Sequence, residues 1–178
     1  MCPRIVDTGL RTIEEKLRAI GFYSKNRYEW CIADCAAAIS NITSVTLYDT
    51  LGAEAMEAML EETQLRAIVC SAEHVESFLK FAKKSQLQHL IYFDHLSQNV
   101  LDEVAAAGLK ITRFEDAIKE GQEQLGDNDD FCDVAPKPES IFTVCYTSGS
   151  TGRAKGALLP NRGFLASASN IDLFDANF

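Results

Sequence analysis

The sequence Tyr-Thr-Ser-Gly-Ser-Thr-Gly-Arg-Ala-Lys-Gly, residues 146–156, decides how the rest of the chain is interpreted. An apolar, β-branched segment at 141–145 precedes it and predicts a buried strand. Within the stretch, glycines allow backbone N–H groups to approach a ligand closely, hydroxyls donate hydrogen bonds, and a lysine adds a mobile positive charge. These are the components of a loop that binds polyphosphate.

Three other interpretations of this stretch are weaker. A flexible Ser/Gly linker has a similar composition, but a linker does not need an apolar strand before it and an apolar run after it. The Walker loop requires Gly, four residues and then Gly-Lys-Ser/Thr. Counted from Gly149, the second glycine position holds Ala154, and the residue after Lys155 is Gly156. The dinucleotide fingerprint also fails, because Gly149 and Gly152 are three apart with no glycine two residues before them.

Upstream, segments with strand character alternate with segments of helical periodicity about every 20 to 25 residues. This alternation predicts right-handed β-α-β crossovers and an α/β fold, in which helices cover both faces of a mostly parallel sheet (αβα layers). The expected strands lie at 17–23, 42–48, 66–70, 89–93 and 109–114, and the expected helices at 28–39, 53–62, 73–84, 97–107 and 115–120.

Several local predictions accompany these elements. Asn26 and Glu29 have the spacing of a capping box for the first helix. Gly108 and Gly121 are expected to end later helices. The buried side of the first helix is predicted to carry the apolar residues Tyr28, Cys31, Ile32, Cys35 and Ile39, with Trp30 packing between helix and sheet.

The segment 122–139 has no periodicity and contains the acidic run Gly-Asp-Asn-Asp-Asp at 126–130, so it is interpreted as a solvated connector rather than a calcium loop. The connector leads into a strand–phosphate loop–strand unit at 140–160. After Pro160, Asn161 is expected to cap a further helix that contains Phe164 and Leu165.

Composition limits the classes of partner. The chain has 178 residues, enough for one domain or part of a larger one, and 47% are hydrophobic. The formal net charge of −9 argues against nucleic acid as the main partner and against bulk electrostatic binding to anionic membranes. We expect neither a signal peptide nor a membrane span, because no run approaches the ~20 apolar residues that a spanning helix needs.

The six cysteines show no C-x-x-C pair and no zinc-finger spacing. Cys31 and Cys35 are four residues apart and therefore share one side of the predicted helix, where buried reduced thiols are the expected state. This pattern indicates a reducing compartment.

Three segments resemble one enzyme family. The stretch at 146–156 is similar to the phosphate-binding signature of the adenylate-forming, AMP-binding superfamily, except that Ala154 stands where the family usually has proline. Pro160 and Asn161 likewise stand where these enzymes commonly carry Thr-His. Two further segments, Ser-Lys-Asn-Arg-Tyr-Glu-Trp at 24–30 and Leu-Tyr-Asp-Thr-Leu-Gly at 47–52, resemble those of long-chain fatty acid–CoA ligases, with Thr46 in place of the usual proline.

The resemblance implies an ATP-dependent, AMP-forming ligase. A fatty acid carboxylate would attack the α-phosphate of ATP, and the thiol of coenzyme A would then displace AMP from the acyl-adenylate. Lys155 would act as the catalytic cation on the leaving pyrophosphate. The residues expected to bind the ATP phosphates are Thr147, Ser148, Gly149, Ser150, Thr151, Gly152 and Lys155. Mg²⁺ is expected with the nucleotide, without protein ligands from this chain, and the coenzyme A site is expected outside it.

The same resemblance implies that residues 1–178 are part of a large N-terminal AMP-binding domain, a fragment that alone does not turn over substrate. The expected location is the cytoplasm, with peripheral association of the parent enzyme with endoplasmic reticulum or peroxisome. One alternative is a truncated, non-catalytic relative that serves as a binding or regulatory module. A second is a receiver-like fold with a phosphorylated aspartate, since Asp49 and Asp94 both follow predicted strands.

Overall fold

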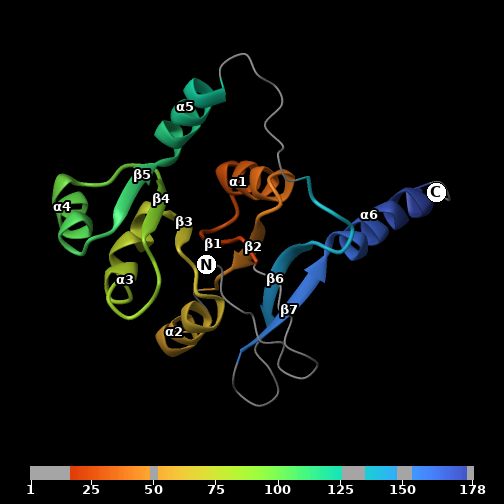
Figure 1. Cartoon of the computed structure of the whole chain (residues 1–178), viewed down its shortest axis with the longest axis horizontal. Coiled ribbons are helices and arrows are strands. Elements are labelled where there is room, and N and C mark those ends of the chain that lie inside the picture. Colours follow the sequence, from red (N-terminus) through yellow and green to blue (C-terminus); the bar gives the residue numbers. More distant parts are fainter. Residues whose placement is uncertain (1–16, 49–51, 126–134, 148–153, 176–178) are drawn as a thin grey trace.

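The computed structural model describes residues 17–48, 52–125, 135–147 and 154–175. These residues contain a seven-stranded sheet of order β5-β4-β3-β1-β2-β6-β7 (Figure 1). The strands are β1 (Ala19–Tyr23), β2 (Thr43–Thr46), β3 (Ala67–Ser71), β4 (His89–Phe93), β5 (Lys110–Arg113), β6 (Ile141–Thr147) and β7 (Lys155–Pro160). The helices are α1 (Tyr28–Ile39), α2 (Gly52–Thr63), the 3-10 turn η2 (Ala72–His74), α3 (Val75–Leu79), α4 (Gln98–Ala106), α5 (Phe114–Leu125) and α6 (Asn161–Asp175).

The sheet is mostly parallel, as the sequence predicts. Strands β1 to β6 pair in parallel, and β7 alone runs antiparallel, as the second arm of a hairpin with β6. Parallel neighbours need a crossover between them, and the helices that alternate with β1 to β5 supply these crossovers. The carboxyl ends of six strands therefore lie along one edge of the sheet.

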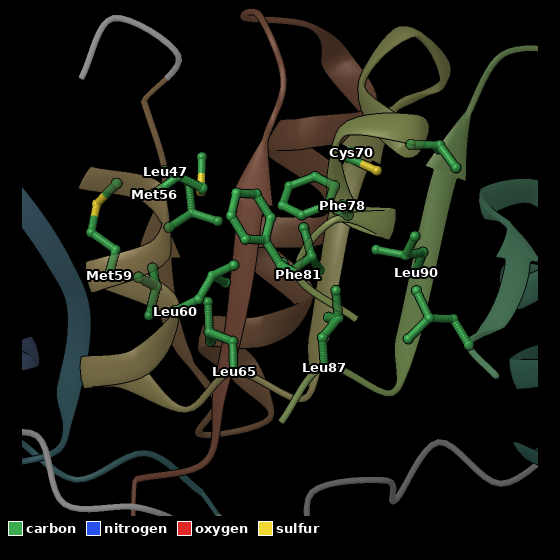
Figure 2. Packing of buried hydrophobic residues seen from close by; sticks show 14 of the residues in the cluster. Leu47, Met56, Met59, Leu60, Leu65, Cys70, Phe78, Phe81, Leu87 and Leu90 are labelled. Carbon is green, nitrogen blue, oxygen red and sulfur yellow. The ribbon is translucent and has the colours of Figure 1, made fainter. Parts of the chain in front are cut away.

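Helices cover both faces of the sheet, so the αβα prediction is confirmed. Alternate residues of one strand point to opposite faces: Ile68 and Cys70 of β3 join one apolar cluster and Val69 joins the other. The larger cluster receives side chains from α2, α3 and α4. Figure 2 shows those of Met56, Met59 and Leu60 from α2 and of Phe78 from α3. The smaller one consists of Phe22, Val69, Phe93 and Phe114, packed beneath α1 and α5.

The prediction for the buried side of α1 is wrong. Tyr28 is 72% exposed, Ile32 and Ile39 are each 48% exposed, and Cys31 and Cys35 are exposed thiols. The side that contacts the sheet carries Trp30, Ala33 and Ala37 instead. Apolar residues lie on almost every side of α1, so their spacing is compatible with two choices of buried side. The side with the small alanines allows the helix to approach the sheet more closely. The predicted packing of Trp30 is confirmed by its edge-to-face contact with Phe22, at 5.6 Å between ring centroids.

The predicted capping box at the start of α1 does not form. The N-cap residue is Arg27, in an extended conformation and without a side-chain cap. Glu29 accepts two hydrogen bonds of 2.6 Å from the Arg27 guanidinium. Such charge-assisted, bidentate bonds are stronger than the neutral bonds of a capping box, which explains the outcome.

Other boundaries differ at the ends of elements. The helix expected at 73–84 is divided into η2, α3 and a turn segment. Helix α5 passes through Gly121 to Leu125, and so includes the first four residues of the predicted connector at 122–139. A single glycine costs only about 1 kcal/mol inside a helix, and the following Gln-Glu-Gln-Leu are good helix formers. Gly108 does follow α4 as predicted, with a φ of 78°.

Helix α6 follows β7 at the edge of the sheet and extends away from it (Figure 1). Phe164 contacts Phe142 of β6, with ring centroids 4.3 Å apart, while Leu165 is 60% exposed. None of the helices in the described part of the chain combines the length and the apolar character that a bilayer-spanning helix requires.

Candidate functional site

The predicted phosphate loop joins the two strands of the β6–β7 hairpin. Thr147 ends β6, Lys155 begins β7, and the two residues are paired across the ladder. Both side chains are exposed. Because β6 is parallel to its neighbour β2, this loop end of the hairpin lies at the carboxyl edge of the sheet. Ser148, Gly149, Ser150, Thr151 and Gly152 lie outside the described residues.

Hydroxyl groups hold β6 against β2 beneath the loop. The Thr143 Oγ1 donates to the Ser44 carbonyl at 3.1 Å, and the Thr43 Oγ1 donates to the Ile141 carbonyl at 2.8 Å. These bonds supplement the parallel ladder, and Val144, which follows Thr143 in β6, is completely buried. The strand that leads to the loop is thus firmly anchored, a condition for presenting a loop in one geometry.

Crowding within the hairpin favours glycine at position 156. Gly156 lies opposite Tyr146 in the ladder. A Cβ added at Gly156 would lie 3.0 Å from Val144 Cγ1 and 3.3 Å from Tyr146 Cζ. The Tyr146 ring therefore covers the position that a side chain would occupy, which gives the lysine–glycine pair at 155–156 a structural reason.

Tyr146 links the hairpin to helix α2. Its side chain is 5% exposed, and its hydroxyl donates a hydrogen bond of 3.0 Å to Glu62 Oε2. Glu62 is 84 residues earlier in the sequence, near the end of α2. Sequence patterns gave no signal for this pair, because a contact between distant segments leaves no periodicity to detect.

A second polar cluster lies at the same carboxyl edge, where β1 and β4 end. The Arg27 guanidinium contacts Glu29 and also donates to both carboxylate oxygens of Asp94, at 2.7 and 2.9 Å. It lies 4.8 Å from the centroid of the Phe93 ring. The hydrogen bonds from Arg27 lower the pKa of Glu29 to about 2, and the two carboxylates raise the pKa of Arg27. Arg27 and Glu29 therefore remain charged at neutral pH.

This cluster argues against the receiver-like alternative at Asp94; Asp49, its other candidate aspartate, lies outside the described residues. Asp94 adopts a positive φ of 72° and its carboxylate is already paired with Arg27, so it is poorly placed to accept a phosphoryl group. Beside the Arg27 cluster lies a pocket of about 160 Å³. It opens at the point in the sheet where the connection after β1 leads toward one side edge and the connection after β3 leads toward the other. Its described lining contains no carboxylate and is formed by Tyr23, Ser24, Lys25, Asn26, Trp30, Thr46, Leu47, Tyr48 and His74.

Past the hairpin, β7 ends at Pro160 and Asn161 is the first residue of α6. The helix is present as predicted. The Asn161 side chain donates to the Lys137 carbonyl at 3.0 Å, and its backbone N–H donates to the Ser140 carbonyl at 2.9 Å. Asn161 thus fastens the segment before β6 to the segment after β7, which closes the base of the hairpin.

Comparison with known proteins identifies the family. A model of the family described as "AMP-binding enzyme" matches residues 9–178. The chain belongs to the AMP-binding enzyme family. This membership agrees with the resemblance seen in the phosphate-loop sequence and with the parallel sheet whose carboxyl edge carries that loop.

Individual relatives narrow the comparison within the AMP-binding family. The chain is 31% identical over 144 residues to fatty acyl-CoA synthetase B of Dictyostelium discoideum, covering 80% of this chain and 21% of that protein. It is 30% identical over 151 residues to the peroxisomal long chain acyl-CoA synthetase 7 of Arabidopsis thaliana, covering 84% of this chain and 21% of the relative. The chain therefore spans about a fifth of the length of these relatives.

A solved structure has the same fold. The carboxylic acid reductase didomain of Segniliparus rugosus, in complex with AMP, matches with a TM-score of 0.68 at 23% identity, over 84% of this chain and 23% of the other. Of the residues predicted to bind phosphate, the structure describes Thr147 and Lys155 and brings them together at the loop end of the hairpin.

Proposed function

We propose that the loop between Thr147 and Lys155 binds the phosphates of ATP, and that the chain contributes this site to the activation of a long-chain fatty acid. In this reaction the fatty acid carboxylate attacks the α-phosphate, which forms acyl-adenylate and releases pyrophosphate. The thiol of coenzyme A then displaces AMP and forms the thioester. The pairing of Thr147 with Lys155 at the carboxyl edge of the sheet is the observation that supports this proposal best.

The geometry of the hairpin suits a polyphosphate ligand. Residues directly opposite in an antiparallel pair have Cβ atoms about 4.5–5.5 Å apart, so Thr147 and Lys155 can reach one ligand. The Thr147 hydroxyl would donate a neutral hydrogen bond, and the Lys155 ammonium would neutralise charge that develops on the leaving pyrophosphate. Neutral hydrogen bonds contribute about 0.5–1.5 kcal/mol and charged ones about 1.5–3 kcal/mol. Positioning and charge stabilisation are the principal requirements of such a transfer.

Magnesium would enter this site with the nucleotide. Among the described residues, no three His, Cys, Asp or Glu side chains converge as metal ligands. Mg²⁺ usually keeps several waters and binds substrate phosphates, so it does not need a cage of protein ligands here. Coenzyme A would act as the second substrate.

We propose a cytoplasmic or peroxisomal location for the enzyme. Two relatives support this proposal, the peroxisomal long chain acyl-CoA synthetase 7 of Arabidopsis thaliana and the peroxisomal acyl-CoA ligase 891 of Penicillium brevicompactum. Fluorescence microscopy of a tagged chain in its native cells, with a peroxisomal marker, tests the location; exclusion from both compartments would contradict it.

Calorimetric titration of the purified chain with ATP and with pyrophosphate, both in the presence of Mg²⁺, tests the phosphate site. We expect Lys155→Ala to weaken both affinities by about tenfold or more, because a charged hydrogen bond is lost. Lys137→Ala is the matched control, since Lys137 is an exposed lysine in the segment before β6. A wild-type chain that binds neither ligand, or a Lys155→Ala variant that binds as tightly as the control, would overturn the proposal.

A second experiment addresses the reaction itself. The chain is incubated with palmitate, ATP and coenzyme A, and pyrophosphate, acyl-adenylate and acyl-CoA are measured separately. We expect the isolated chain to form neither acyl-adenylate nor acyl-CoA, as the family resemblance implies. Acyl-adenylate made with wild-type chain and lost in Lys155→Ala would contradict that expectation while supporting the role of Lys155. If ATP binds while no acyl-adenylate forms, the contribution of the chain is limited to nucleotide binding.

A further inference from the structure

We propose that Glu62 is a positioning residue for the phosphate loop, acting through the hydroxyl of Tyr146. This inference rests on the proposed function. Glu62 belongs to α2, whereas Tyr146 belongs to β6 and directly precedes Thr147, the last described residue before the loop. The hydrogen bond of 3.0 Å between them joins a helix on one face of the sheet to the strand that carries the site.

The Tyr146 ring is held on more than one side, so its hydroxyl can control the strand end. The ring is almost completely buried, and it lies against Gly156, its partner in the ladder. The bond to Glu62 restricts rotation and tilt of the phenol. A shift of Tyr146 would be transmitted directly to Thr147 and, across the ladder, to Lys155.

The chemistry of the pair fits a positioning role. Glu62 offers a carboxyl oxygen as acceptor, and the Tyr146 hydroxyl donates to it at 3.0 Å across the boundary between α2 and β6. Glu62 contacts the ring from the α2 side and is not placed on the hairpin itself. It therefore does not need to touch the nucleotide to influence binding.

Two measurements on the purified chain test the inference: affinity for ATP with Mg²⁺, and hydrogen exchange of the backbone amides of β6 and β7. We expect Glu62→Ala to weaken ATP binding by about tenfold. Glu62→Gln, which keeps an acceptor oxygen, should stay within about twofold of wild type. Tyr146→Phe should match Glu62→Ala, and the double variant should be no weaker than either alone, because both remove the same bond. Glu61→Ala is the control, since Glu61 is the exposed neighbour on the same helix.

Hydrogen exchange separates positioning from general destabilisation. We expect Glu62→Ala to increase exchange about tenfold at the loop end of the hairpin, at Thr147, Lys155 and Gly156. Exchange at Thr143 and Leu159, near the base of the hairpin, should increase less than about twofold. A uniform increase along both strands would show that the bond serves stability alone and would overturn the inference.

The two proposals fail in different ways. If wild-type chain does not bind ATP, the proposed function fails, and the exchange pattern alone still decides whether Glu62 orders the loop end of the hairpin. If wild-type chain binds ATP and Glu62→Ala matches Glu61→Ala in both affinity and exchange, the role of Glu62 is refuted while the proposed function stands.

Discussion

Arg27 donates two hydrogen bonds to Asp94, a residue 67 positions later in the chain, at N–O distances of 2.7 and 2.9 Å. The same guanidinium donates twice to Glu29. Asp94 is half-exposed, but the Glu29 side chain is only 8% exposed. One cation thus compensates a buried carboxylate and ties the segment after β1 to the segment after β4.

Replacing Arg27 with alanine should destabilise the fold strongly. The change leaves Glu29 buried without its cation, and breaking a buried pair in this way costs about 3–5 kcal/mol. Because Asp94 is partly solvated, we expect a loss near the lower end, about 3 kcal/mol. Urea unfolding at pH 7 measures it. The control is Lys25→Ala: the Lys25 ammonium is 3.9 Å from Glu73 and both groups are exposed, so the loss should be about 1 kcal/mol or less. Equal losses of unfolding free energy in Arg27→Ala and Lys25→Ala would contradict the stabilising role assigned to the Arg27–Glu29 pair.

The Arg27–Glu29 pair also predicts how stability depends on pH. Arg27 lowers the pKa of Glu29 from its ordinary value of 4.5 to about 2. In the unfolded chain Glu29 takes up a proton near pH 4.5, whereas in the folded chain it does so only near pH 2. The pair therefore stabilises the fold fully above about pH 4.5, and this stabilisation is lost as the pH falls toward 2.

Unfolding midpoints in urea between pH 6 and pH 2.5 check this dependence. Wild type should lose stability throughout the lower part of this range. Glu29→Gln has no proton to gain at this position, so it should start less stable and lose less as the pH falls. A slope for Glu29→Gln as steep as that of wild type would mean that other carboxylates are responsible.

Two glycines should respond in opposite directions to alanine. A Cβ at Gly156 would crowd Val144 and Tyr146, and overpacking of this kind costs about 1–3 kcal/mol. Among the described residues, no atom outside the adjoining helix backbone lies within 4 Å of a Cβ at Gly121, inside α5, so Gly121→Ala should stabilise by about 0.5–1 kcal/mol. Unfolding free energies from urea titration measure both. Gly156→Ala combined with Val144→Ala should not be additive, because the second change removes the atom that the new methyl meets; strict additivity would contradict the crowding.

The elements themselves could be predicted from sequence because their signals are local. Strand β4 coincides with the predicted segment 89–93, and Gly108 follows α4 in the left-handed conformation that favours glycine. The hydroxyls and glycines of the predicted phosphate loop likewise stand next to one another in the chain. Their arrangement around a ligand stays a prediction, since residues 148–153 lie outside the described part of the structure.

The features that sequence reasoning missed depend on tertiary contacts. Glu62 and Tyr146 are 84 residues apart, so no pattern of spacing connects them. Arg27, whose bonds to Glu29 replace the expected capping box, is also held by Asp94, which is 67 residues away and reaches it only because β1 and β4 end at one edge of the sheet. The orientation of α1 was ambiguous for a different reason: a helix that is apolar on most sides offers two solutions, and packing against Phe22 selects one.

The orientation of α1 predicts how the cysteines react with iodoacetamide. Cys31 and Cys35 are exposed, so both should be alkylated in the folded chain. Cys70 is buried in β3, and its burial raises the pKa of the thiol to about 12. At pH 8 only about one Cys70 thiol in ten thousand is then ionised, and the thiolate is the reactive species. Peptide mapping by mass spectrometry after a short reaction should find label at Cys31 and Cys35 and none at Cys70. All three should react in concentrated urea, and protection of Cys31 equal to that of Cys70 in the folded chain would mean that α1 is turned the other way.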